Sequence, residues 1–226
     1  MTKAIIQRRH KQIQLRQKEI QRNQFTRIKD FELKNRENPL LWAESNLELL
    51  YSKCIEKTKS AIIRDQEKRA ECLAEIFKSG KYNSLKLLDG DGRMLAQIII
   101  AFYRNGLTLP DITVVEIDKT RYIYHCNNLP LCINKEYGDI FSTAVDITTY
   151  VYYNFCSIGF IVNQGNFMSK LERTANYMLG FTLEGSFRRK NTYGKKQKTE
   201  MKTVIPRLKK MKLVSKRGGF YITVVK

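Results

Sequence analysis

The sequence has little of what holds secreted or metal-binding proteins together. It has 226 residues with only five cysteines and two histidines, and no two cysteines form a Cys-x-x-Cys pair. A zinc site therefore lacks an adequate ligand set, and a disulfide framework is not expected. We predict that the protein binds no metal and works in a reducing intracellular compartment: the cytoplasm, the nucleus, a virus factory or a virion.

Long hydrophobic runs are also missing. No apolar stretch approaches the length of a transmembrane helix, and the N-terminus has no apolar signal-peptide core. We therefore expect no membrane partner. Hydrophobic residues still make up 42% of the chain, which is enough for a packed core and excludes a wholly disordered protein.

Positive charge is abundant and lies at the two ends of the chain. Lys and Arg number 41 against 22 Asp and Glu, which gives a net charge of +19. Residues 1–36 hold eleven Lys and Arg against three acids, and residues 186–226 hold fourteen against one. Solubility needs only a modest net charge, so two segregated basic ends favour contact with the phosphates of DNA or RNA. The candidates for this contact are Arg188, Arg189, Lys190, Tyr193, Lys195, Lys196, Lys198, Arg8 and Arg9.

Composition divides the chain into three parts. Residues 1–38 predict a basic helical extension, because isoleucines recur every seven residues and Pro39 ends the pattern. Residues 39–80 predict two helices, at about 40–58 and 60–78, and a protein partner could bind the N-terminal helices. Residues 81–226 predict one α/β domain in which short apolar strands alternate with helices.

The expected elements of this α/β domain can be given by range. We predict strands at 85–88, 112–117, a short one ending at 138–141, 149–155 and 181–188, with helices at 94–104, 120–128, 166–179 and 199–211. A closing antiparallel hairpin is expected at 213–225, with its turn at Gly218-Gly219.

Polar motifs follow the predicted strands. They are Asp89-Gly90-Asp91-Gly92, Glu116 with Asp118, Gly138-Asp139, and Asn154. In open α/β sheets, ligands bind outside the carboxyl ends of the strands. Glycines there let the backbone approach a ligand closely, and a carboxylate at a strand end can accept hydrogen bonds from two ribose hydroxyls.

In order and spacing, these motifs resemble those of class I S-adenosylmethionine-dependent methyltransferases, above all the DNA amino-methyltransferase branch of phages and large viruses. The resemblance covers about residues 85–226 and implies a Rossmann-like sheet of seven strands whose last strand is inserted. It also implies S-adenosylmethionine as cofactor and methyl transfer to nucleic acid at a base amino group. The implied cofactor contacts are Asp89, Gly90, Asp91, Gly92, Glu116, Asp118, Asp139 and Ile140.

The resemblance places catalysis at the end of the fourth strand. There Asn154 would accept hydrogen bonds from the target amine, and Phe155 would stack on the extruded base. Two features depart from the family. Phe155 and Cys156 stand where it has two prolines, and the glycines lie one residue early relative to Asp89. They leave open an alternative, a non-catalytic nucleic-acid-binding protein of a virion or accessory kind on the same fold.

Overall fold

The computed structural model describes residues 33–52, 54, 56–142, 145–154, 170–171, 173–174, 176–182, 212–217 and 221–225. The chain separates into two units, Met1–Leu33 and Lys34–Lys226, and the description below concerns the second. The predictions for residues 1–32, for the helix at 199–211 and for the hairpin turn lie outside the described residues.

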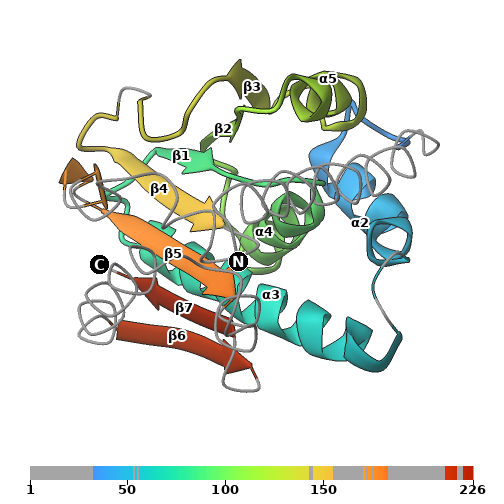
Figure 1. Cartoon of the computed structure of the whole chain (residues 1–226), viewed down its shortest axis with the longest axis horizontal. Helices are drawn as coiled ribbons and strands as arrows, with labels where there is room; N and C mark the ends of the chain where they lie inside the picture. Colours follow the sequence, from blue (N-terminus) through green and yellow to red (C-terminus); the bar gives the residue numbers. More distant parts are fainter. Residues whose placement is uncertain are drawn as a thin grey trace, which may run out of the picture. The chain divides into compact units, whose positions relative to one another are not determined.

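The second unit is built on a seven-stranded sheet with the order β3-β2-β1-β4-β5-β7-β6 (Figure 1). The first five strands are parallel, whereas β7 pairs antiparallel with both β5 and β6. The last strand of the chain is therefore inserted between its two predecessors. The strands are β1 (Ser84–Leu87), β2 (Asp111–Glu116), β3 (Asn134–Tyr137), β4 (Thr149–Asn154), β5 (Tyr177–Thr182), β6 (Lys212–Arg217) and β7 (Tyr221–Val225).

Helices connect the strands and precede them. α2 (Pro39–Tyr51) and α3 (Glu56–Phe77) come before the sheet, α4 (Arg93–Arg104) links β1 to β2, and α5 (Lys119–Asn128) links β2 to β3. The starts of two helices follow from local sequence. The side chain of Asn38 caps α2 ahead of Pro39, and the side chain of Asp118 caps α5.

The core lies where α3 and α4 pack on the sheet. Four consecutive residues of β4, Tyr150 to Tyr153, are buried, as expected of a parallel strand covered on both faces. The hydroxyl of Tyr152 lies between Arg69 of α3 and the sulfur of Met94 of α4. This central strand fixes both helices relative to the carboxyl end of the sheet.

The segment before and within α2 is tied to the end of α5. The indole Nε1 of Trp42 donates to the carbonyl of Asn128 at 2.9 Å, and Nε of Arg36 donates to the carbonyl of Leu129 at 2.9 Å. Both carbonyls belong to the C-terminal end of α5, where backbone oxygens have no helical partner. Residues 36–42 therefore act as a side-chain cap for a helix far along the sequence.

Two sequence predictions are wrong. The third strand was expected to end at 138–141, but β3 ends at Tyr137. Residues 166–179 were expected to form a helix and residues 181–188 a strand, yet Tyr177–Thr182 is strand β5. Helical residues in this region are described only at 170, 171 and 173. The spacing of Phe167, Leu171, Ala175 and Met178 suits a helix, but β5 lies between β4 and β7, where an apolar run is buried on both faces. Position in the sheet overrides that periodicity.

Candidate functional site

The parallel strands bring most of the predicted site residues to one edge of the sheet. Leu87 of β1 pairs with Val114 of β2 and with Tyr152 of β4, and Glu116 of β2 pairs with Tyr137 of β3. The motifs after these four strands therefore begin at the same carboxyl edge. This is the edge at which open α/β sheets bind ligands.

The loop after β1 is held by Asp89 and shaped by glycine. The Asp89 side chain is 2% exposed, and its Oδ2 accepts a hydrogen bond from the backbone of Leu95 in the first turn of α4 at 2.8 Å. Gly92 has φ +88°, and a Cβ there would lie 3.0 Å from Leu129. A Cβ on Gly90 would meet only Arg121, at 3.6 Å. Gly92 is required by the fold, whereas Gly90 leaves room beside the loop.

Asp91 has an internal partner. Its carboxylate accepts from Nε of Arg93 at 3.0 Å and lies 2.8 Å from Nη2 of the same residue, a two-pronged arrangement. Nη1 of Arg93 also lies 2.9 Å from the sulfur of Cys54, in the connection between α2 and α3. The guanidinium thus links the loop after β1 to that connection.

The end of β2 presents an acid and an exposed apolar side chain. Glu116 is buried, and its Oε1 accepts from the backbone of Asp118 at 2.8 Å. Oε2 lies 3.9 Å from Nη1 of Arg121. Ile117, between the two acids, is 60% exposed. Because the Asp118 side chain caps α5, Glu116 is the acid better placed to bind a ligand.

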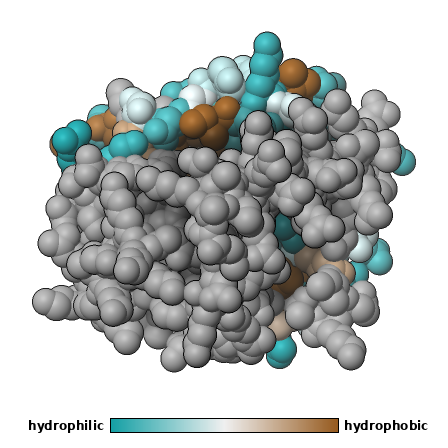
Figure 2. Space-filling view, in the orientation of Figure 1, coloured by the Kyte–Doolittle hydropathy of each residue, from teal (hydrophilic) through white to brown (hydrophobic). Residues whose placement is uncertain are grey.

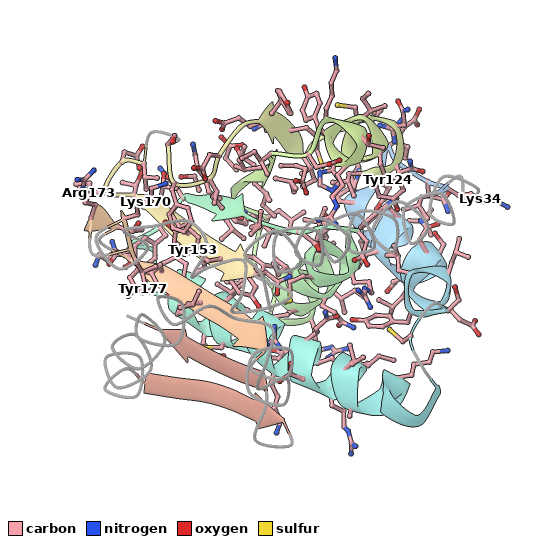
Figure 3. All side chains as sticks on the ribbon, in the orientation of Figure 1. Lys34, Tyr124, Tyr153, Lys170, Arg173 and Tyr177 are labelled. Atoms are coloured by element: carbon pink, nitrogen blue, oxygen red, sulfur yellow. The ribbon has the colours of Figure 1, made fainter. Side chains whose placement is uncertain are left out.

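Residues after β3 form a separate cluster. Asp139 lies 3.5 Å from Nζ of Lys170, and the ring of Phe141 stacks on Tyr153 with centroids 4.9 Å apart. Ile140 is buried. Figure 3 shows Tyr153 and Lys170 on the β4–β5 side of the sheet, away from Tyr124 of α5. The structure therefore gives Asp139 a lysine partner that the sequence did not predict.

Asn154 ends β4 next to a buried ion pair. Its Oδ1 lies 3.4 Å from Nη1 of Arg69, which also donates to the Tyr152 hydroxyl at 3.1 Å. Nη2 of Arg69 pairs with Asp65 one helical turn earlier. A guanidinium has only donors, so the contact orients the oxygen of the amide toward α3. Phe155 lies outside the described residues, as do all nine residues predicted to contact phosphates.

Burial shifts the acids of this edge toward their neutral forms. Desolvation, followed by the nearby charge of Asp91, raises the pKa of Asp89 to about 7. Burial also raises the pKa of Glu116, against the hydrogen bond from Asp118. Burial also favours the neutral form of His125, and for a base this means a lower pKa. Burial lowers the pKa of His125, next to the Gly90 backbone, to about 4.

His125 predicts a measurable acid sensitivity. An unfolded histidine has a pKa of about 6.5. The neutral buried ring therefore contributes to the stability of the folded protein above that pH, and this contribution is lost as the pH falls toward 4. We compare the free energy of unfolding of His125→Leu with that of the wild type at two pH values. The difference, variant minus wild type, is expected to be about 2 kcal/mol larger at pH 4.5 than at pH 7.0, because only the wild type loses stability on acidification through this ring. Urea unfolding at the two pH values measures this difference. An equal difference at both would show that His125 does not titrate on unfolding.

Four contributors to this edge escaped sequence reasoning. Ile117, Arg121, Arg93 and Lys170 each lie beside a predicted residue, yet nothing in their own spacing marks them. A signal was available only for Ile117, an apolar residue between two acids at the end of a strand. Lys170 reaches Asp139 only through the fold, whereas Arg93 and Arg121 lie two and five residues from the acids they contact.

The surface near the site is mixed in polarity, and the described residues contain no cluster of metal ligands. Along the β3 and α5 edge, at the top of Figure 2, hydrophobic and hydrophilic groups are interspersed. Among the described residues, no three His, Cys, Asp or Glu side chains gather in a way that could hold a metal ion. Cys54, Cys72, Cys126 and Cys132 are free thiols. No helix in the described part of the chain is both long and apolar enough to span a bilayer.

Comparisons with known proteins find likenesses only at the level of structure. No protein family and no curated protein matches the sequence. An O-methyltransferase from Bacillus cereus in complex with SAH has a TM-score of 0.46 at 10% identity, over 89% of this chain and 96% of its own. The 16S rRNA methylase ArmA has a TM-score of 0.44 at 14% identity, over 85% and 97%. The plantazolicin methyltransferase BpumL, with SAH, has 0.40 at 15% identity, over 72% and 67%.

The fold itself is α/β, with five parallel strands followed by an antiparallel pair. At these identities and TM-scores, the likenesses assign neither a family nor an activity to this chain. The narrower assignment to viral DNA amino-methyltransferases gains nothing from these likenesses and stays a prediction.

Proposed function

We propose that this protein is an S-adenosylmethionine-dependent methyltransferase that acts on nucleic acid, at a base amino group. One observation carries the proposal. A sheet with an inserted antiparallel last strand presents, at its carboxyl edge, a glycine loop after β1 and a buried acid at the end of β2. The sequence resemblance implies this combination, and the strand order and the geometry of the loop support it.

The described residues fit the cofactor. Gly90 leaves room beside the backbone, Glu116 can accept hydrogen bonds from two ribose hydroxyls, and the exposed Ile117 offers an apolar surface for an adenine ring. Arg121 would move from Glu116 as the hydroxyls replace its long contact. S-adenosylmethionine supplies, when bound, a methyl group on a positively charged sulfur.

We assign binding of the methyl acceptor to Asn154, which would contact the target amine, and to the basic ends of the chain, which would contact the phosphates. The second lone pair of the Asn154 oxygen would accept a hydrogen bond from the target amine, which raises the electron density on the attacking nitrogen. The basic ends supply the phosphate contacts, because a net charge of +19 far exceeds what solubility needs. DNA and RNA are equally consistent with this charge.

Calorimetric titration of the full chain with S-adenosylmethionine tests the proposal. We expect saturable binding that Glu116→Ala weakens by about 10- to 100-fold, the loss of charged hydrogen bonds to hydroxyls. Asp111→Ala is the matched control, because Asp111 begins the same strand at the opposite edge of the sheet. Transfer of a labelled methyl group to DNA or RNA then identifies the acceptor. Equal weakening by both variants, or no binding, would contradict the proposed cofactor site.

A second candidate is a nucleic-acid-binding protein that retains the fold without catalysis. The observation that favours it is the internal pairing of site residues: Glu116 with Arg121, Asp91 with Arg93, and Asn154 with Arg69. This candidate predicts salt-dependent binding to nucleic acid with no heat from S-adenosylmethionine even at millimolar concentration.

A further inference from the structure

Asp89 differs from the other carboxylates of the site in its surroundings. Among the described residues, Asp91, Glu116, Asp139 and Asp65 each lie within 4.0 Å of a basic side chain, and Asp89 has none at that distance. It is nevertheless the most deeply placed acid of the loop, and its Oδ2 is bound by the backbone N–H of Leu95. A buried charge without a counter-ion is unfavourable, so this carboxyl group has a reason to be neutral.

In the described part of the chain, none of the groups packed around the loop forms an ion pair with Asp89. They are Tyr51 of α2, Arg69 of α3, Arg93 of α4, Tyr124 and His125 of α5, Tyr152 of β4, and Asp91 of the loop itself. The two guanidiniums are held by Asp91 and Asp65, and burial keeps the His125 ring neutral at ordinary pH. The three phenols are uncharged donors. Of the two nearby charges, Asp91 raises the pKa of Asp89 and Arg93 lowers it, and burial has a larger effect than either.

We propose that Asp89 is partly protonated in the free protein at neutral pH and gives up this proton when a positively charged group of the ligand binds beside it. The inference rests on the proposed function, which supplies a ligand with two cationic groups, an amino group and a sulfonium. On binding, the O–H bond of the carboxyl breaks, the proton passes to the buffer, and the carboxylate becomes the counter-ion of the ligand.

Asp89 titrates near neutral pH, so the release of its proton on ligand binding can be measured under ordinary conditions. Burial raises the pKa of Asp89 to about 7 in the free protein, and a cation in contact favours the ionised form. At pH 7.0 the free protein then carries about half a proton on this carboxyl, and binding releases it. Because an acid must lose a proton to bind, affinity is expected to fall as the pH is lowered.

Proton release is measured by calorimetry at pH 7.0 in phosphate and in Tris, two buffers with different enthalpies of ionisation. Wild-type protein is expected to release about half a proton per bound S-adenosylmethionine. Asp89→Asn keeps the acceptor for Leu95 and is expected to release almost none. Repeating the titration with the demethylated product, which keeps the amino group but lacks the sulfonium, identifies the cation: release with both ligands points to the amino group, and release with S-adenosylmethionine alone points to the sulfonium.

The pH dependence of affinity gives a second measurement that needs no variant. From pH 7.5 to pH 6.0, the affinity of wild-type protein for S-adenosylmethionine is expected to fall about eightfold. Saturable binding without proton release, or with equal release from Asp89→Asn, would overturn the inference and leave the proposed function standing. No binding at any pH would overturn both.

Discussion

Replacing Trp42 with alanine is expected to lower the free energy of unfolding by about 4 kcal/mol, among the largest losses that a single truncation in this chain can cause. Trp42 is the only tryptophan, and its side chain is fully buried. Its ring lies 3.4 Å from where a Cβ on Gly92 would stand, and its Nε1 donates to Asn128. The variant opens a cavity under the loop and leaves a buried carbonyl without its donor. Urea unfolding at pH 7 measures the loss.

The control for this prediction is Trp42→Phe. Phenylalanine fills part of the same volume but cannot donate to Asn128, so we expect a loss of about 2 kcal/mol, roughly half that of alanine. Because Trp42 supports the loop from below, Trp42→Phe is also expected to weaken S-adenosylmethionine binding. If Trp42→Ala lost less than 1 kcal/mol, the packing of α2 against the loop described here would be wrong.

The elements that could be predicted from the sequence are those in which local pattern and burial agree. The fourth strand is a run of Val and Tyr that the structure buries on both faces. The first and second strands carry buried Leu, Ile and Val, although Lys86 and Thr113 are only half-buried. α4 and α5 begin after Gly92 and Asp118, residues that commonly start helices. The carboxyl edge follows from this order, since parallel strands end on the same side of a sheet.

The elements that could not be predicted depend on distant partners. The helical spacing of apolar residues before β5 continues to Met178, and the pairing with β4 and β7 makes Tyr177–Thr182 a strand. The pairing of Asp139 with Lys170 likewise arises from the fold. Asp118 was expected to be one of the cofactor contacts, and the capping of α5 now gives its side chain a structural role. For β5 and for Asp139 a contact far along the sequence decides the outcome, whereas Asp118 caps the helix that begins at the next residue.

A second large effect is expected at the buried ion pair of α3. Arg69 and Asp65 are 1% and 7% exposed, so Arg69→Met leaves an uncompensated carboxylate in the core. Removing one partner of such a pair typically costs about 3–5 kcal/mol. Urea unfolding of Arg69→Met is expected to show a loss in this range. A loss below 1 kcal/mol would show that Asp65 finds another partner or water.

The double variant Asp65→Leu, Arg69→Met distinguishes charge from packing. Removing both charges leaves only apolar side chains of similar volume, so most of the loss from Arg69→Met is expected to be recovered, and the coupling in the double-mutant cycle measures the pair. The same variant tests the role of Arg69 in methyl transfer. Asn154 loses its contact with Nη1 of Arg69, whereas the loop after β1 keeps the hydrogen bond between Asp89 and Leu95. We expect it to bind S-adenosylmethionine with wild-type affinity and to transfer the methyl group more slowly. Wild-type transfer would instead mean that Arg69 does not orient the amide during the reaction.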